Sequence, residues 1–149
     1  MDTRKKIGEI LLDAGSVTQA QLDEALRDQV SSNNKLGELL IEKGVLTAQQ
    51  VTEALALQFM LPVVNVNEYL GNISAINSLP KSLMERLGVF PLELQNNGNT
   101  LLVAISDPLD LVVQDELRMA TTLNIKFALA TEQNIYSALV AITSGAQPS

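Results

Sequence analysis

Residues 6–29 read KIGEILLDAGSVTQAQLDEALRDQ, and residues 35–58 read KLGELLIEKGVLTAQQVTEALALQ. Shifted by 29 positions, the two 24-residue stretches align without a gap, and five residues separate them. Eleven aligned positions are identical, and five of the other thirteen are apolar in both copies, which indicates a duplicated unit. The identical positions, numbered in the first copy, are Lys6, Gly8, Glu9, Leu11, Gly15, Thr18, Gln21, Glu24, Ala25, Leu26 and Gln29.

Each copy is predicted to form two short helices joined by a turn. Apolar residues recur at the three- and four-residue spacing of one helix face, and Gly15 stands where the first helix would end. Thr18 then offers an N-cap, with Gln21 three residues later as its capping-box partner. The second copy repeats this pattern with Gly44 and the pair Thr47–Gln50. Helices of two to three turns are not stable singly in water, so the four must pack on one another and on the rest of the chain.

The second half of the chain predicts strands as well as helices. Apolar runs at residues 89–95 and 100–106 flank Asn96-Asn97-Gly98-Asn99, which is typical of a β-hairpin turn. Before the hairpin, we expect an extended segment at residues 61–64 and a helix over Lys81–Leu87 that ends at Gly88. After the hairpin, we expect a helix from Asp107-Pro108 to about Thr121, a strand over Ile125–Ala130, and a helix from Thr131 to about Ile142. The order β-β-α-β-α allows the third strand to lie parallel to the second.

Together these patterns predict an α+β fold. In it, an N-terminal tandem helical-hairpin repeat of four short helices packs on a small three-stranded β/α subdomain. We expect the repeat subdomain to span residues 1–60, the α/β subdomain residues 61–145, and a frayed tail residues 146–149.

The composition excludes several classes of function. The 149 residues carry a net charge of −7, contain neither Cys nor His, and include only 3% aromatic residues. Imidazole chemistry, Cys/His zinc sites and base-stacking platforms are therefore excluded, and duplex nucleic acid is a poor partner. No phosphate-cradling loop or hydrolase motif occurs, so we expect no enzyme and no cofactor. No run reaches the ~18 apolar residues of a membrane span, and no secretory signal stands near the start, so we expect a cytoplasmic protein without membrane insertion.

Two pairs of polar residues stand out within the repeat. Gln29 and Gln58 continue the apolar stripe of their helices, where an amide needs hydrogen-bond partners. Such a glutamine either ties down neighbouring backbone or recognises a ligand, and the sequence leaves both alternatives open. Lys6 and Lys35 precede helix starts that carry a glycine two residues later, an arrangement that can hold a phosphate and let a ligand approach the backbone.

The repeat resembles the tandem motif of the MshEN domain, which forms the N-terminus of many type IV pilus assembly ATPases and type II secretion ATPases. The first copy matches the family pattern at Gly8, Leu11, Leu12, Gly15, Val17, Leu22, Leu26 and Gln29. The second copy matches it at Gly37, Leu40, Ile41, Gly44, Val45, Leu46, Val51, Leu55 and Gln58. The five-residue spacer also agrees, and Asp107-Pro108-Leu109-Asp110 with Ala130-Thr131-Glu132 resembles the companion subdomain.

The resemblance implies a regulatory domain that binds cyclic di-GMP, a ring of two guanines and two phosphates with near two-fold symmetry. Each copy would take one half of the ligand, and acids at Glu38 and Asp107 would accept hydrogen bonds from guanine. The implied partners are a secretion or pilus motor ATPase and its inner-membrane platform protein. The implied ligand-binding residues are Lys6, Ile7, Gly8, Leu11, Leu12, Leu22, Leu26, Gln29, Lys35, Leu36, Gly37, Glu38, Leu40, Ile41, Val51, Leu55, Gln58 and Asp107.

The chain departs from the family pattern at the first position of both copies, where lysine replaces arginine. Lysine keeps the charge but loses the planar fork that bonds or stacks on a base, at a cost of about tenfold or more in affinity for the pair. This departure favours the alternative of an adaptor that docks the ATPase to the platform protein without binding nucleotide. DNA binding is disfavoured, because residues 1–60 hold six basic and nine acidic residues.

Overall fold

A computed structural model of the chain describes residues 7–143 and confirms the predicted α+β class, with eight α-helices and one three-stranded sheet in that range. The chain divides into two compact units at the junction of Met60 and Leu61. Lys6 and the predicted tail at residues 146–149 lie outside the described residues. Within residues 7–143, no helix combines the length and the apolar character needed to cross a membrane.

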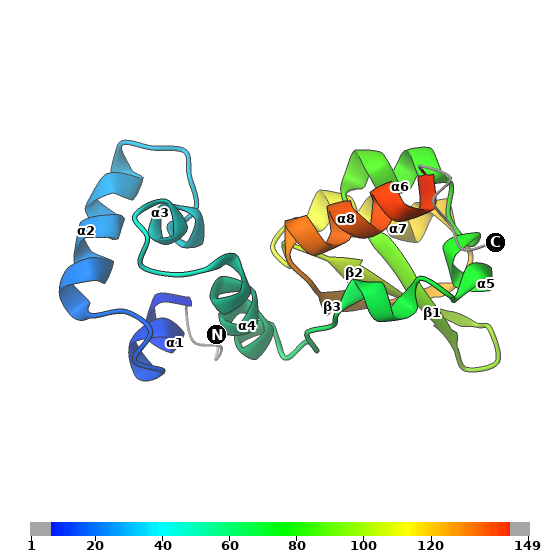
Figure 1. Ribbon diagram of the computed structural model, residues 1–149, viewed down its shortest axis with the longest axis horizontal. Helices are drawn as coiled ribbons and strands as arrows, with labels where there is room; N and C mark the ends of the chain where they lie inside the picture. Colours follow the sequence, from blue (N-terminus) through cyan, green and yellow to red (C-terminus); the bar gives the residue numbers. More distant parts are fainter. Residues whose placement is uncertain (1–6, 144–149) are drawn as a thin grey trace. The chain divides into compact units, whose positions relative to one another are not determined.

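The first unit consists of the four short helices of the repeat (Figure 1). They are α1 (Ile7–Asp13), α2 (Gln19–Val30), α3 (Leu36–Glu42) and α4 (Ala48–Phe59). Gly15 and Gly44 follow α1 and α3 with φ of 74° and 76°, a left-handed conformation that glycine adopts without strain. Complete capping boxes, Thr18 with Gln21 and Thr47 with Gln50, start α2 and α4 as the sequence predicts.

The two copies of the repeat interlock through their helices. Helix α1 of the first copy contacts α4 of the second, and α2 of the first copy contacts α3 of the second. The ten buried residues of the core consequently form five pairs, each related by the 29-residue shift. The pairs are Ile10 with Leu39, Leu11 with Leu40, Val17 with Leu46, Leu22 with Val51, and Ala25 with Ala54.

The second unit is built on a sheet of three strands in the order β1-β2-β3. These are β1 (Phe90–Gln95), β2 (Thr100–Ile105) and β3 (Asn124–Leu129); β1 is antiparallel to β2, and β3 is parallel to β2. All six residues of the central strand β2 are buried, so both faces of the sheet are covered along it.

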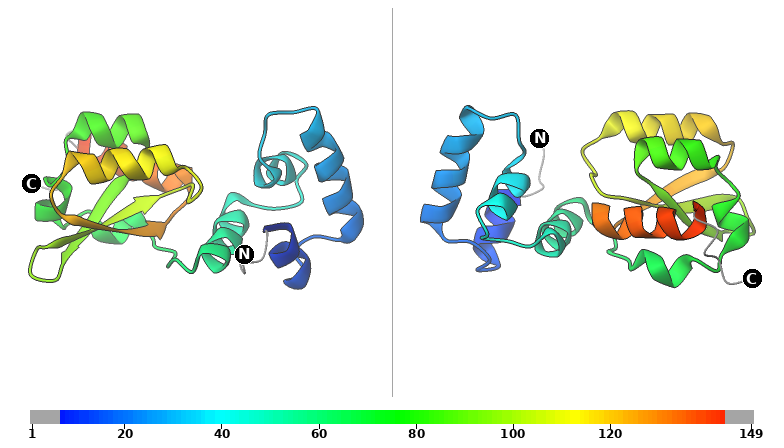
Figure 2. Two further views of the ribbon diagram at one scale, coloured as in Figure 1. Left: turned by 180° about the vertical axis from the view of Figure 1, so that it is seen from behind. Right: turned by 45° about the horizontal axis from the view of Figure 1, so that its top comes forward.

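Helices α6 (Lys81–Leu87), α7 (Leu111–Ala120) and α8 (Glu132–Thr143) cover the sheet, with α6 beside both others (Figure 2). Helix α6 contacts α8, and Arg86 of α6 forms an ion pair with Glu116 of α7 at 2.7 Å. The start and end predicted for α6 agree with the structure, because Pro80 precedes it and Gly88 ends it in the left-handed conformation.

Helix α7 begins at Leu111, so the predicted start at Asp107-Pro108 is wrong. The Oδ1 atom of Asp107 accepts a hydrogen bond from the Leu109 N–H at 2.9 Å, which folds these residues into a separate turn. Asp110 then becomes the N-cap, and its side chain accepts a bond from the Val113 N–H at 3.2 Å. Asp107 and Asp110 are three residues apart and offer the same capping chemistry, so the sequence pattern does not show which of them caps α7.

Two short helical elements are missing from the predicted order. They are the 3₁₀ turn η1 (Val66–Tyr69) and α5 (Ile73–Ile76), each of four residues. Four residues make about one turn, which is too short to show a helical period. Helix α5 packs along β1, where the Asn72 side chain donates to the carbonyl of Leu92 at 2.8 Å. Leu92 lies at a β-bulge, so Asn72 satisfies a carbonyl that the strand ladder leaves out.

We predict that Gly37→Ala destabilises the chain more than Gly8→Ala. A Cβ atom at Gly37 would lie 2.8 Å from Cγ1 of Val51, whereas at Gly8 the nearest atom is Cδ1 of Leu22 at 3.3 Å. Valine cannot swing its methyl groups away as the end of a leucine can. Alanine has a higher helix propensity than glycine, which offsets part of the cost of the steric clash. We therefore expect Gly37→Ala to lower the free energy of unfolding, measured by urea denaturation, by about 1–2 kcal/mol.

The matched control is Gly71→Ala, because a Cβ atom there meets nothing within 4 Å. We expect a change within about 0.5 kcal/mol for this variant. Equal effects of Gly37→Ala and Gly71→Ala would show that the packing against Val51 is not a constraint.

Candidate functional site

Several of the residues that the sequence assigned to a ligand lie inside the first unit instead. Leu11, Leu22, Leu40 and Val51 are buried in its core, with exposed fractions of at most 9%. Gly8 and Gly37 are buried too, and the space where their side chains would stand is taken by Leu22 and Val51. These two glycines therefore allow close packing of helices, which is a sufficient reason for their presence in each copy.

A second group of the predicted residues reaches the surface of the same unit. Leu26 and Ile41 are exposed at 43% and 37%, so each offers apolar surface to solvent. Lys35 and Glu38 are exposed at the start of α3. The half-buried members are Ile7, Leu12, Gln29, Leu36, Leu55 and Gln58. This accessible subset can contact a ligand, and it includes apolar side chains, amides, a cation and an acid.

The two glutamines differ in what they contact. The Nε2 atom of Gln29 donates to the carbonyl of Asn34 at 3.5 Å, a long bond that ties α2 to the spacer between the copies. Within residues 7–143, the Gln58 side chain makes no hydrogen bond. No side-chain polar atom of the described part of the chain is both buried and unpartnered, so the Gln58 amide reaches solvent. Gln29 thus has a structural partner, and Gln58 is available to a ligand.

The start of α3 has the features of an anion-binding helix end on a small scale. Lys35 occupies the N-cap with an extended backbone and makes no capping bond with its side chain. The Lys35 carbonyl accepts a hydrogen bond from the Leu39 N–H at 3.1 Å, which is the first bond of the helix. The backbone N–H groups of the first helical turn have no partner within the helix and point out of its N-terminal end. The lysine and these N–H groups carry positive charge at one place.

Asp107, the predicted site residue of the second unit, lies at the carboxyl end of β2. It is half-buried, and one carboxylate oxygen is committed to the Leu109 N–H. A hollow of about 40 Å³ adjoins it, lined also by Gly88, Ser106 and Asp110. That volume suits a water molecule and excludes a purine ring.

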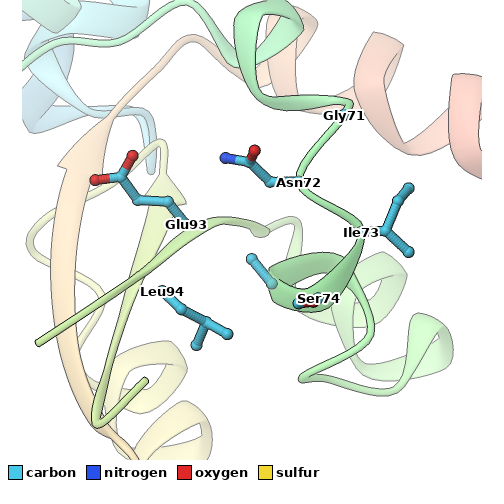
Figure 3. Close-up of a pocket in the computed structure, with 7 residues that line it drawn as sticks. Gly71, Asn72, Ile73, Ser74, Glu93 and Leu94 are labelled. Atoms are coloured by element: carbon cyan, nitrogen blue, oxygen red, sulfur yellow. The ribbon is translucent and has the colours of Figure 1, made fainter. Parts of the chain in front are cut away.

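A larger hollow in the second unit was not predicted from the sequence. It is an open groove of about 560 Å³ between α5 and β1, lined by Gly71, Asn72, Ile73, Ser74, Ala75, Glu93 and Leu94 (Figure 3). None of the residues expected to bind a ligand lines it. Glu93 is its only charged lining residue and accepts a bond from Gln95 at 2.8 Å, so the groove repels phosphates. Its α5 wall gives no sequence signal, which explains why it was missed.

One ion-pair cluster breaks the symmetry of the repeat. Lys43, the C-cap of α3, pairs with Asp28 and with Glu24 of α2, the latter at 3.3 Å. Hydrogen bonds to Asp28 first and Glu24 second raise the pKa of the Lys43 ammonium. The residues that correspond to Lys43 and Asp28 in the other copy are Ala14 and Leu57, so the contact between α1 and α4 has no such cluster. Among residues 7–143, no group of acidic side chains is arranged to hold a metal ion.

Comparisons with a family model and with solved structures indicate the same family. The model of the MshEN domain matches residues 59–148. A solved structure of MshE with cdg (cyclic di-GMP) superimposes with a TM-score of 0.81 at 33% identity, covering 91% of this chain and 97% of that one. The N-terminal domain of XpsE shares the fold with a TM-score of 0.71 at 22% identity, covering 93% and 96% of the two chains.

A relative of full length is also similar. The type IV pilus assembly ATPase PilB of Myxococcus xanthus (strain DK1622) is 26% identical over 134 residues, which is 90% of this chain. The chain spans 23% of the length of that relative. The alignment with MshE extends over more of the chain than the family model does, and so reaches the repeat as well.

We predict that the Lys43 cluster stabilises the first unit in a way that depends on salt and pH. Lys43→Met keeps the aliphatic stem and removes the charge, so it should lower the melting temperature at low salt, and 1 M NaCl should shrink the difference from the parent chain. Since the folded pKa is raised, the contribution is full below the ordinary lysine value of 10.5 and is lost as the pH rises through the folded value.

The converse variant tests the same explanation. Ala14→Lys combined with Leu57→Asp places the cluster between α1 and α4, beside the existing Glu53, and should raise the melting temperature at low salt. A Lys43→Met chain that melts like the parent at low salt would contradict the assignment.

Proposed function

Because the chain belongs to the MshEN domain family, we propose that it binds cyclic di-GMP and regulates the motor ATPase of a type IV pilus or type II secretion system. The observation that carries this proposal is the likeness to MshE with cyclic di-GMP, at 33% identity over nearly the whole chain. In the same proposal the domain acts in the cytoplasm and has no catalytic activity of its own. Its two subdomains span residues 1–60 and 61–145.

The duplicated architecture suits a ligand with two equal halves. The five repeat-related core pairs give the two copies matching scaffolds. In our proposal the exposed and half-buried apolar residues, with Leu26 and Ile41 foremost, cover the guanine rings. Gln29 and Gln58 bond the polar edges of the bases, and Lys6 and Lys35 with their helix starts take the phosphates.

Acidic residues complete the proposed recognition of guanine. Glu38 is exposed in the first turn of α3 and accepts from guanine N–H groups. Asp107 of the second unit stays a prediction from the family resemblance. The buried members Leu11, Leu22, Leu40 and Val51 act in this proposal by holding the helices, not by touching the ligand.

The lysines at the two motif starts support a second candidate function. Without the planar guanidinium, each half of the site loses a bidentate or stacking contact. The alternative proposal is therefore an adaptor that docks the ATPase to the inner-membrane platform protein and binds no nucleotide. Capture of the platform protein that is insensitive to added cyclic di-GMP favours this alternative.

We predict that the purified chain binds cyclic di-GMP with measurable heat in calorimetry at tens of micromolar protein. Gln58→Ala should weaken binding by about tenfold, because its amide is available and no other group replaces it. Gln49→Ala on the same helix is the matched control and should bind as the parent does, since Gln49 is exposed and its side chain donates to Glu53 at 3.3 Å.

Cyclic di-AMP serves as the control ligand, because it keeps the phosphates and changes the edges of the bases. Equal affinity for both dinucleotides would remove the proposed roles of the glutamines and acids. No heat with cyclic di-GMP would remove the primary function and leave the adaptor.

We further predict that Lys6→Arg combined with Lys35→Arg tightens cyclic di-GMP binding about tenfold or more, since two guanidinium groups restore planar contacts. Lys126→Arg in the second unit controls for an added guanidinium elsewhere and should leave the affinity unchanged. An unchanged or lower affinity in the double variant would show that these lysines do not contact the ligand.

A further inference from the structure

The outer edge of β3 carries backbone groups that nothing in the described chain uses. Strand β3 pairs with β2 through residues 124, 126 and 128, as the bond from the Asn124 N–H to the Asn99 carbonyl at 3.0 Å indicates. In a parallel ladder the alternate residues point their N–H and C=O groups to the other side. Within residues 7–143, the outward groups of Ile125 and Phe127 have no hydrogen-bond partner.

The same edge already accepts a strand at its other end. The Leu129 N–H donates to the carbonyl of Pro62 at 2.8 Å, and the Val64 N–H donates to the carbonyl of Leu129 at 3.0 Å. This pairing is parallel and centres on Val63 opposite Leu129. It stops there because the preceding residues, Met60 and Phe59, belong to the end of α4. The edge is therefore built for a parallel strand, and half of its length is unfilled.

The side chains around the unfilled half differ on the two faces of the sheet. On one face, Ile125 and Phe127 are half-buried, and the Arg118 guanidinium of α7 lies 5.5 Å from the centre of the Phe127 ring. On the other face, Lys126 is exposed and forms no ion pair with the described residues. A strand added beside β3 would therefore lie next to Ile125 and Phe127 on one face of the sheet and next to the Lys126 ammonium on the other.

We propose that the open edge of β3 binds an extended segment of a partner protein as a parallel fourth strand, with apolar residues on the Phe127 face and an acidic residue beside Lys126. Backbone bonds to Ile125 and Phe127 supply the affinity, and the alternation of side chains supplies the specificity. This surface is independent of the cyclic di-GMP proposal, since it uses none of the residues assigned there.

A second copy of this chain is a poorer occupant of the edge. Two β3 edges that pair about a two-fold axis through Lys126 would place the two lysines directly opposite each other. Like charges in that position destabilise a strand pair. In that register the charge of Lys126 disfavours self-association and favours an acidic segment.

The test uses the whole chain labelled with ¹⁵N and two synthetic probes, acetyl-EVEVEVE-amide and acetyl-KVKVKVK-amide. We expect the acidic peptide to shift the amide signals of Ile125 and Phe127 and to slow their hydrogen exchange, and the basic peptide to bind at least about tenfold more weakly. Lys126→Glu should reverse this preference. The same acidic peptide methylated on alternate backbone nitrogens should lose binding, which tests the backbone bonds without any change to the protein.

Ile125→Pro removes one outward N–H and leaves the bonds to β2 in place, so it should weaken the acidic peptide about tenfold while the β2 signals stay unchanged. The proposal is overturned if both peptides bind equally, or if the methylated peptide binds as well as its parent. It is also overturned if the Ile125 and Phe127 amides are already protected in the unliganded chain, or if sedimentation shows a dimer that Ile125→Pro dissolves.

Discussion

The first unit depends on one constraint: no single copy of the repeat can bury its own apolar stripe. Helices of seven and twelve residues are too short to persist alone, and a hairpin of two such helices offers one half of a core. Pairing α1 with α4 and α2 with α3 closes the core from both copies at once. Each fully buried leucine or isoleucine contributes about 1.5–3 kcal/mol, so the five core pairs outweigh the contribution of the capping boxes. Folding of one copy therefore requires the other.

Symmetry in the core does not extend to every part of the surface. The core pairs match residue for residue, but Lys43 and Asp28 correspond to Ala14 and Leu57, and Ser16 corresponds to the half-buried Val45. Packing tolerates change least where side chains are enclosed, so a duplicated sequence keeps its paired interior while exposed positions diverge. In the proposed function, a ligand with two equal halves consequently meets equal scaffolds with unequal surroundings. The partnered Gln29 and the available Gln58 are one instance of this inequality.

The sequence predicted those elements that carry a local signal and missed those that depend on tertiary contacts. Local signals that determine the backbone conformation lie where expected. They are the capping boxes, the Asn96-Asn97-Gly98 turn, and Pro80 and Gly88 at the two ends of α6. The start of α7 and the existence of α5 depend on which aspartate caps and on which helix covers β1, and neither choice is local. For the candidate site, periodicity identified the apolar stripe but not which members face inward. Leu40 is fully buried and its neighbour Ile41 is 37% exposed, a difference set by where the opposite copy lies.

Packing and ligand binding make overlapping demands on the same short motif, and this limits what a motif match means. The glycines are required by Val51 and Leu22, and the buried leucines by the core, whether or not any nucleotide is present. A chain can therefore keep these positions for stability alone. The core does not require the exposed side chain of Leu26, nor the amide of Gln58, which has no hydrogen-bond partner among residues 7–143. In our proposal, these residues carry the information about the ligand, and the change from arginine to lysine at the two motif starts separates a nucleotide sensor from an adaptor on the same fold.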